Sequence, residues 1–395
     1  MIKIDPYRVQ KADIVVGIPS YNEADNIAFV VKQCNLGLKK YFPDLKSVII
    51  NADNHSPDDT RTAFLNSVNT IPKMYLSTDP GIKGKGNNFF NLFRETRRLS
   101  ARAVIVIDAD ITSITPEWVR DLATPILKSK YNYVSPLYSR NEYDGTITNN
   151  ICYPLIYSLL GANIRQPIGG DFALSGSLID YYLRKKWQET TYQYGIDIFM
   201  TMNAILGNFS ACQVSLGTKV HKPSAPKLGA MFIQVIGTLF DILLDSKVLW
   251  LTKKRIQQIP DFGATGQSQP QNLSIDYKSI KQTSIQEFKQ YNSVISQIIT
   301  PEIYQRLYKM YQAGRVTIGK DLWARIVYEM LYQYDKSHRT APVIEAMKPL
   351  YFGRVATFIR QTLDLDHYDS EKEIQRQAKR FYRKKKYLIK MYGNN

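Results

Sequence analysis

The chain has 395 residues, 44% of them hydrophobic, so it can bury a large core in one domain or two. Its cysteines, Cys34, Cys152 and Cys212, lie far apart in the sequence, which argues against a disulfide framework and a cysteine-based zinc site and fits a reducing cytoplasm. The net charge of +17 favours anionic partners, namely phosphorylated metabolites, nucleic acid or an acidic membrane face. The sequence has no zinc finger or RNA-binding motif, so nucleic acid is not expected.

The N-terminal segment, MIKIDPYRVQ, has no apolar signal-peptide core. The longest apolar stretch, residues 229–244, contains Gln234 and Asp241 and is short for a bilayer span, so we expect it to form a buried helix. Both features favour a cytoplasmic protein.

Segments typical of strands and helices alternate through the first half of the chain. Apolar β-branched runs predict buried strands at 13–18, 46–51, 74–76 and 104–110. Helices are predicted between them, with an apolar stripe over 27–38, Ser56 as N-cap before Pro57, a helix over 87–99 and another starting at Thr115-Pro116-Glu117. This alternation predicts an α/β fold with a doubly wound, mostly parallel sheet.

Polar segments follow three of these strands, at 19–23, 53–59 and 108–110. Since ligands of such sheets bind beyond the carboxyl ends of the strands, we expect the three segments to gather on one edge. The loop 81–87 joins them with three glycines and two lysines, and because it opens a helix it suits phosphate. Its spacing is neither that of a P-loop nor that of a dinucleotide fingerprint, which argues against P-loop NTPases and Rossmann dehydrogenases.

Asp108 and Asp110 end an apolar run. Alternation along a strand puts both carboxylates on the same side, where two oxygen ligands suit a hard cation such as Mg²⁺ or Mn²⁺. A strand followed by an ordinary polar turn is the alternative.

The middle of the chain holds three further candidates. Gln166 to Asp171 form a Pro-Gly turn whose adjacent glycines, Gly169 and Gly170, allow close approach of a ligand or of another backbone segment. Asp197 precedes a helical run and is either a binding residue or an N-cap. His221 lies beyond a predicted strand, 211–216, and is either a metal ligand or a structural histidine.

From about residue 228 onward the composition becomes helical, which predicts two domains, 1–227 and 228–395. An exposed Pro/Gly/Gln-rich loop is expected at 260–276. Helices are expected at 300–314, 318–335, 340–363 and 370–392. The last of these is strongly basic, so it forms either a solvated face or a contact with an anionic surface.

Taken in order, these motifs resemble the GT-A glycosyltransferases, and more narrowly the retaining mannosylglycerate and glucosyl-3-phosphoglycerate synthases. The resemblance rests on Ile18-Pro19-Ser20-Tyr21-Asn22-Glu23, the 53–59 loop, Gly84-Lys85-Gly86-Asn87, Asp108-Ala109-Asp110, Pro167-Ile168-Gly169-Gly170-Asp171, Gly195-Ile196-Asp197 and Val220-His221-Lys222. It covers residues 12–225, and the C-terminal part is similar in character only. It implies a GT-A domain with a helical C-terminal region, and a homodimer.

The resemblance also implies roles. By this resemblance the nucleoside would be bound by Pro19, Tyr21, Glu23 and Asp53. The diphosphate would be bound by Gly84 and Lys85. The metal would be held by Asp110 and His221, and Asp108, beside Ala109, would contact the ribose or a metal-bound water. The Ile168-Gly169-Gly170 backbone would line the sugar and acceptor pocket, Asp171 and Asp197 would bind sugar or acceptor hydroxyls, and Thr148 would contact a glycerate carboxylate.

The implied activity is metal-dependent transfer of glucose or mannose from a UDP- or GDP-sugar to a small acidic acceptor such as glycerate or 3-phosphoglycerate, as in compatible-solute synthesis. One departure from the phosphoglycerate enzymes is Thr146, where they carry an arginine for the acceptor phosphate; Arg140, Arg165 or Lys222 are possible substitutes. Retention of configuration is favoured, because motifs of the membrane-bound inverting relatives are missing from the sequence.

Two other functions stay open. One is an inverting transferase acting on a polyprenyl phosphate, with the basic C-terminal helix in peripheral contact with the membrane. The other is a non-catalytic scaffold that binds nucleotide-sugar or nucleic acid.

Overall fold

The computed structural model of the chain describes residues 1–222, 228–252, 255–263, 269–271, 273 and 275–393. The chain divides into two compact units: Met1–Arg140, Gln166–Pro226 and Ile259–Gln271 form the first, and Asn141–Arg165, Lys227–Gln258 and Asn272–Asn395 form the second. This division differs from a single boundary at 227, because segment 141–165 groups with the later helices and segment 259–271 groups with the sheet.

The first unit contains a nine-stranded sheet in the order β1-β4-β3-β2-β5-β8-β6-β9-β11. Its strands are β1 (Ile2–Ile4), β2 (Ile14–Ser20), β3 (Ser47–Asp53), β4 (Lys73–Ser77), β5 (Ala103–Val106), β6 (Tyr133–Ser139), β8 (Phe172–Ser175), β9 (Ala211–Thr218) and β11 (Asp261–Phe262). Its helices are α1 (Ile27–Tyr41), α2 (Thr60–Asn66), α3 (Lys85–Arg98), α4 (Pro116–Leu127), α6 (Gly176–Arg184) and α7 (Ile196–Leu206).

The sheet is mostly parallel. Strands β4, β3, β2 and β5 run parallel to one another, as do β6, β9 and β11. The edge strand β1 and the inserted strand β8 run antiparallel to their neighbours. The predicted α/β class with a mostly parallel sheet is therefore confirmed.

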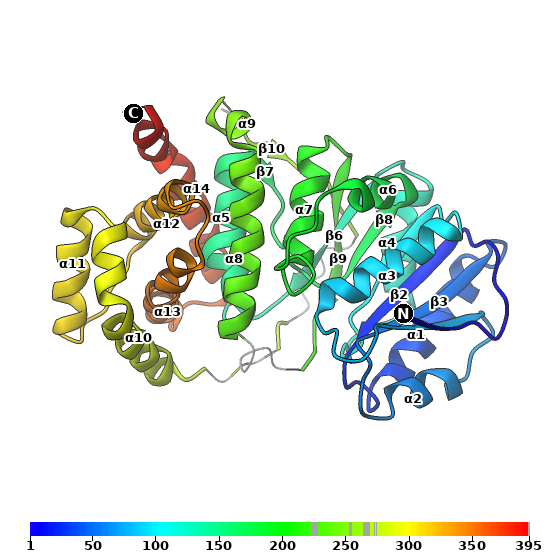
Figure 1. Ribbon diagram of the computed structural model, residues 1–395. Coiled ribbons are helices and arrows are strands. Elements are labelled where there is room, and N and C mark those ends of the chain that lie inside the picture. The colour runs from blue at the N-terminus through cyan, green and yellow to red at the C-terminus, as the bar shows by residue number, and fades with distance from the viewer. Residues whose placement is uncertain (223–227, 253–254, 264–268, 272, 274, 394–395) are drawn as a thin grey trace. The chain divides into compact units, whose positions relative to one another are not determined.

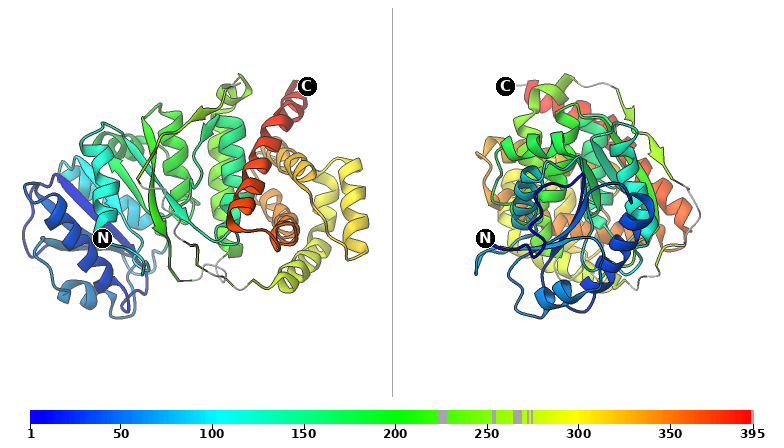
Figure 2. Two further views of the ribbon diagram at one scale, coloured as in Figure 1. Left: turned by 180° about the vertical axis from the view of Figure 1, so that it is seen from behind. Right: turned by 90° about the vertical axis from the view of Figure 1, so that its right-hand side faces the viewer.

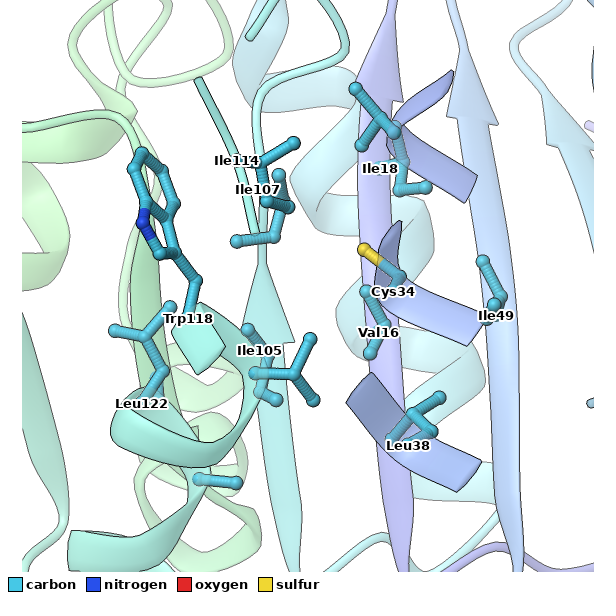
Figure 3. Packing of buried hydrophobic residues seen from close by; sticks show 14 of the residues in the cluster. Val16, Ile18, Cys34, Leu38, Ile49, Ile105, Ile107, Ile114, Trp118 and Leu122 are labelled. Atoms are coloured by element: carbon cyan, nitrogen blue, oxygen red, sulfur yellow. The ribbon is translucent and has the colours of Figure 1, made fainter. Parts of the chain in front are cut away.

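Both faces of the central strands are covered, as their unbroken apolar sequences predict. Val16 and Ile18 point toward Cys34 and Leu38 of α1, and Ile105 lies near Leu122 of α4 (Figure 3). On the other face, a side chain added at Gly17 would lie 2.2 Å from Leu92 of α3, so α3 packs directly on β2 there.

The second unit is helical. It contains the π-helical turns η1 (Thr148–Cys152) and η2 (Ile156–Leu160), the strands β7 (Ala162–Asn163) and β10 (Gln257–Gln258), and the helices α5 (Tyr153–Leu155), α8 (Leu228–Asp245), α9 (Lys247–Thr252), α10 (Tyr277–Ile298), α11 (Pro301–Gln312), α12 (Lys320–Lys336), α13 (Ala341–Thr362) and α14 (His367–Gly393). In the views of Figures 1 and 2, the part of the chain drawn from yellow to red is entirely helical. The predicted helical C-terminal region is confirmed.

Among the described residues, α8 is the one helix whose length and composition would let it cross a membrane, and half of it is buried inside the folded chain. Phe232 stacks on Tyr351 at a centroid distance of 4.7 Å, and Phe240 packs on Tyr334 at 5.8 Å. The helix therefore uses aromatic side chains to pack on α13 and α12, which agrees with the expected buried helix.

Some predicted boundaries were wrong. Helix α2 begins at Thr60 rather than after the Ser56-Pro57 pair, because Ser56 bonds Asp53 and Asn22 instead of capping a helix. Residues 261–262, expected in a loop, pair with β9 as strand β11. Residues 264–268, 272 and 274 of the predicted loop lie outside the described residues.

A half-buried ion pair joins Arg165, which follows β7, to Glu371 of α14 in the second unit. Arg165 donates from Nε and Nη2 to Glu371 at 2.8 Å each. Although burial opposes its ionisation, the guanidinium lowers the pKa of Glu371 below its usual value. Stability from this pair is then present above the pKa of an unfolded glutamate and is lost as the pH falls through the lower, folded value.

We expect Glu371→Gln to lower the free energy of unfolding by about 2 kcal/mol at neutral pH, since it leaves Arg165 without its counter-charge. The effect should shrink in acid, where the wild-type carboxylate is protonated in both states. Urea unfolding of both chains at neutral and acidic pH measures it. Glu302→Gln is the control, because Glu302 and Arg325 form an exposed ion pair. An equal loss of unfolding free energy in both variants would contradict the prediction.

Candidate functional site

The loops that follow β2, β3 and β5 meet at one edge of the sheet, as predicted. In register, Ser20 lies opposite Asp53, and Gly17 lies opposite Val106. The amide of Asn22 donates to Ser56 Oγ at 2.9 Å, which joins the first two loops. Asn26 Nδ2 donates to the carbonyl of Ala109 at 2.9 Å, which joins the third.

Asp53 organises this edge. Its Oδ1 accepts from Ser20 Oγ at 2.8 Å and Ser56 Oγ at 2.6 Å, and its Oδ2 accepts from the Ser56 amide at 2.8 Å and Tyr75 OH at 2.9 Å. A carboxylate has about four acceptor positions, so protein donors occupy all of them. The side chain therefore positions the loops, and a nucleoside bound here would contact its neighbours.

Asp108 lies between two lysines. Its Oδ1 is 2.9 Å from Lys85 Nζ, and its Oδ2 is 3.4 Å from Lys219 Nζ. Burial raises the pKa of Asp108, but the two ammonium groups outweigh it, and the pKa lies below its usual value. Asp108 is therefore an anion whose charge is compensated by the protein.

The strand prediction placed Asp108 and Asp110 within the same strand, and this was wrong. Strand β5 ends at Val106, and both carboxylates lie in the following loop. The loop leaves the sheet because the amide of Asp108 donates to Asp171 Oδ1 at 2.8 Å rather than to a neighbouring strand.

Lys219 and Asp171 form a buried pair beneath this loop. Lys219 Nζ donates to Asp171 Oδ2 at 2.9 Å and to the carbonyl of Gly169 at 2.8 Å. Asp171 is fully buried, and its Oδ2 also accepts from Tyr138 OH. Protein donors therefore hold the carboxylate of Asp171, which supports a positioning role for it.

The sequence analysis did not identify Lys219 as a site residue. The signal in the sequence is the position of Lys219 directly after β9, and this does not distinguish it from other lysines. The side chain of Lys219 is 4% exposed, and Asp108 and Asp171 raise its pKa although burial opposes the rise.

Asp110 has the opposite electrostatic environment. Burial and the charge of Asp108 raise the pKa of Asp110, although Lys219 and His221 oppose the rise. The loop of Asp110 is tied to the His221 segment, since the Thr112 amide donates to the carbonyl of Val220 at 2.9 Å. Two neighbouring carboxylates with opposite pKa shifts are typical of functional sites.

The donor set at Asp110 and His221 fits a divalent ion that shares its coordination with a substrate. Among the described residues, no three His, Cys, Asp or Glu side chains form a ready-made metal cluster. A hard cation bound through one or two protein ligands, with phosphate oxygens and waters supplying the rest, needs no such cluster. The incompletely compensated charge of Asp110 is the feature that a cation would relieve.

Lys85 connects Asp108 to Asp197. Its Nζ lies 3.3 Å from Asp197 Oδ1, and Asp197 is in the first turn of α7, whose N-cap is Gly195. Asp197 is therefore not the helix cap. Burial opposes the charge of Lys85, but Asp108 and Asp197 raise its pKa above the usual value. Burial raises the pKa of Asp197, although Lys85 opposes that rise.

The glycine loop does not present its first amides to a ligand, in contrast to the predicted phosphate cradle. The amide of Gly84 donates to Asn54 Oδ1, that of Gly86 to the carbonyl of Gln193 at 3.0 Å, and that of Asn87 to the carbonyl of Tyr192 at 3.0 Å. A side chain at Gly86 would lie 1.9 Å from the carbonyl of Thr191. The glycines therefore allow the segment before α7 to pack on this loop.

The glycine pair before β8 also serves close packing. Gly170 has a φ of +93°, and a side chain there would lie 2.1 Å from Asp108 Oδ2. Ile168 and Gly169 belong to the same turn, and the Gly169 carbonyl is bound by Lys219. The turn therefore packs directly against Asp108 and Lys219, which belong to the same unit.

The remaining predicted residues are dispersed. Pro19 lies inside β2, and Tyr21 is 36% exposed with Lys83 Nζ 5.3 Å from its ring centroid. Glu23 accepts from Lys222 Nζ at 2.8 Å, and burial raises its pKa. Thr148 lies in the second unit, where it begins η1 and its buried Oγ1 has no hydrogen-bond partner among the described residues.

Three asparagines at the same edge were missed by sequence reasoning. Asn51 Oδ1, Asn54 Nδ2 and Asn88 Oδ1 are buried and have no hydrogen-bond partner within the described part of the chain. Buried polar atoms of this kind are costly unless a ligand or water satisfies them. A signal was present in the strand-end sequence Asn51-Ala52-Asp53-Asn54, which is polar where a buried strand ends.

Residues 15–187 match the family model of glycosyl transferase family 2. This segment is therefore similar to glycosyl transferase family 2. The match includes the 19–23, 53–59, 81–87 and 108–110 segments, and it confirms the resemblance to glycosyltransferases. A search of curated proteins finds no match.

Solved structures similar to this chain include glucosyl-3-phosphoglycerate synthase from Mycobacterium tuberculosis. Its complex with Mn²⁺, UDP and glucosyl-3-phosphoglycerate is 26% identical with a TM-score of 0.47, over 58% of this chain and 80% of that one. Its complex with Mn²⁺, UDP-glucose and phosphoglyceric acid has the same identity and TM-score, over 58% and 79%. The complex with Mg²⁺ and UDP gives the same four values as the UDP-glucose complex.

Proposed function

We propose that this protein is a divalent-metal-dependent hexosyltransferase that moves glucose or mannose, with retention, from a UDP- or GDP-sugar to a small acidic acceptor such as glycerate or 3-phosphoglycerate. The family match supports glycosyl transfer. The observation that carries the proposal is the carboxylate pair, in which Asp108 is compensated by two lysines while Asp110 is left with a raised pKa.

In this proposal each residue has a distinct task. Asp110 and His221 would hold the divalent ion, which when bound supplies positive charge to the departing diphosphate. Lys85 adds an ammonium at the same edge, held in place by Asp108 and Asp197. Lys219 keeps Asp108 ionised and oriented from below. Charges fixed in advance in this way stabilise a developing anion without reorganisation.

The environments of the carboxylates support retention. An inverting enzyme needs a carboxylate base against the acceptor hydroxyl. Asp171 is fully buried and bonded to Lys219, Tyr138 and the Asp108 amide, which disfavours it as that base. With retention, the departing phosphate oxygen can take the proton of the acceptor hydroxyl, and no protein base is required.

A panel of UDP- and GDP-sugars with Mg²⁺ or Mn²⁺ tests the donor by thermal unfolding. A nucleotide-sugar at a hundred times its Kd should stabilise the chain by about 2.7 kcal/mol, which raises the midpoint by roughly 3 °C. The metal should be required for the full shift. UDP-glucose is included because the solved structure named above holds it.

The same panel with the acceptors glycerate and 3-phosphoglycerate then tests turnover, and the anomeric configuration of the product tests retention. No shift with any nucleotide-sugar, with or without metal, would contradict the proposal. A product of inverted configuration would instead support the polyprenyl-phosphate type of transferase.

A further inference from the structure

A cavity of about 550 Å³ lies in the first unit, at the edge of the sheet opposite Asp108. Its walls come from three segments, 96–102, 126–132 and 175–180. The first two segments directly precede strands β5 and β6, so they lie at the amino ends of those strands. The loops of the candidate functional site follow the carboxyl ends, where ligands of doubly wound sheets bind. The cavity is therefore separate from that site.

Hydrogen bonds join the three walls to one another. The amide of Gly176 donates to the carbonyl of Arg102 at 3.2 Å, and a side chain at Gly176 would lie 2.3 Å from the carbonyl of Ala101. The amide of Ser175 donates to the carbonyl of Asn132 at 2.9 Å, and Asn132 Nδ2 donates to Ser175 Oγ at 3.1 Å. The cavity is therefore built into the fold, and a ligand would meet walls that are already in place.

Three cations line the cavity: Arg97, Arg102 and Lys130. Arg97 and Lys130 are exposed, and neither forms an ion pair or a side-chain hydrogen bond with any described residue. Arg102 has one long contact in the described part of the chain, 3.9 Å between its Nη1 and Asp13 Oδ1. Of the described lining residues, Asp180 alone is acidic. The walls therefore carry a net positive charge that favours an anionic ligand.

Helix α6 begins in the same wall. Ser175 is its N-cap and accepts from the Leu178 amide at 3.2 Å, and Ser177 Oγ lies 3.0 Å from Ser175 Oγ. The N-terminus of a helix carries partial positive charge, and hydroxyl groups beside it can donate to phosphate oxygens. The helix and the three cations thus favour the same kind of ligand, an anion with several acceptor oxygens.

Another part of the wall is apolar. It contains the side chains of Ile126, Leu127 and Ile179 and the ring of Tyr131. Tyr131 is half-buried, and its ring packs on that of Phe262 at a centroid distance of 5.5 Å. An inorganic ion would leave these side chains uncovered, whereas a planar ring attached to a phosphate would cover them.

We propose that this cavity binds a small phosphate ester that carries a planar ring, of the size of a nucleoside monophosphate. Its phosphate would lie among Arg97, Arg102 and Lys130, and its ring would contact Ile126 and Ile179. The volume of the cavity lies within the range of small-molecule sites, about 300–1,000 Å³. The inference does not depend on the proposed transferase activity, because the cavity shares no residue with that site.

Isothermal titration calorimetry of the full chain with AMP, GMP, CMP and UMP tests the proposal. Divalent metal is left out, so that the candidate functional site contributes little. We expect at least one of the four nucleotides to bind at one site per chain, with affinity that falls as salt rises. Ribose 5-phosphate and the matching nucleoside should each bind about tenfold more weakly or worse, because each lacks one half of the ligand.

The single variants Arg97→Gln, Arg102→Gln and Lys130→Gln test the cations. Each should lower the affinity for the nucleotide about tenfold, because each removes a charged hydrogen-bond donor to the phosphate. All three side chains are exposed, so the variants should fold as the wild type does. Unchanged unfolding midpoints in urea check this.

Arg94→Gln, Lys128→Gln and Lys186→Gln are the matched controls. These cations are exposed and lie in or beside α3, α4 and α6, but they do not line the cavity, so affinity should stay within about twofold. Equal losses in both sets, or no binding of any of the four nucleotides at millimolar concentration, would overturn the proposal. So would equal affinity for the nucleotide and ribose 5-phosphate, or binding that Lys85→Gln weakens and the cavity variants do not.

Discussion

Replacing Asp110 with asparagine is expected to reduce metal-dependent glycosyl transfer by about a thousandfold or more, because a neutral amide binds a divalent cation far more weakly than a carboxylate. Stability should move in the other direction. Burial and Asp108 raise the pKa of Asp110, so the ionised carboxylate is unfavourable in the folded protein at neutral pH. The free energy of unfolding should therefore stay unchanged or rise.

Turnover of a nucleotide-sugar and urea unfolding of the same preparation measure the two effects together. Asp59→Asn is the matched control, because Asp59 is an exposed aspartate at the same edge of the sheet with no capping bond. Unchanged turnover in Asp110→Asn, or an equal loss in Asp59→Asn, would remove the basis for the proposed site.

Replacing Lys219 with methionine should lower the free energy of unfolding by about 3–5 kcal/mol, since it leaves Asp171 and Asp108 as buried or half-buried anions without their shared cation. It should also reduce turnover, because Asp108 then no longer holds a fixed position. Urea unfolding at neutral pH measures the stability change. Lys222→Met should cost at most about 1 kcal/mol, since Lys222 pairs with Glu23 and Asp25 near the surface.

The double variant Lys219→Met, Asp171→Asn separates charge from packing. Removing both members of the pair relieves the uncompensated carboxylate, so about half of the lost stability should return. Turnover should not recover to the same extent, because the carbonyl of Gly169 and Oδ2 of Asp108 still lack the contact that Lys219 made. If the double variant is as unstable as the two single losses added together, Lys219 and Asp171 do not act as a pair.

The fold could be predicted from sequence wherever hydrophobic pattern decides it. The strands β2, β3 and β5 each contain a run of β-branched apolar residues, and the helix signal of Pro116 lies where α4 begins. Local signals failed where a distant residue competes for them. Ser56 has the chemistry of a helix cap, but Asp53, three residues earlier, binds its hydroxyl and its amide.

The location of the candidate site at the sheet edge could be predicted from the sequence, whereas most contacts between its residues could not. The rule that loops gather at the carboxyl ends of parallel strands brought Asp108, Asp110 and Lys85 together. Lys219 could not be ranked above other lysines, because its importance depends on β8 being inserted antiparallel between β5 and β6, which puts Asp171 beside it. No local sequence pattern encodes that insertion.

The loop before α7 lies across the start of α3, and its carbonyls bind the amides of Gly86 and Asn87. A diphosphate at this edge would thus meet the single ammonium of Lys85, which Asp108 and Asp197 hold in place, and not a ring of backbone donors. Such a contact recognises the charge of the diphosphate more than its shape. Donors whose phosphates lie in different positions would therefore still be bound. Discrimination between one base or sugar and another would then fall to other residues of this edge, such as Asn51, Asn54 and Asn88, and we expect changes in donor preference to arise from substitutions there.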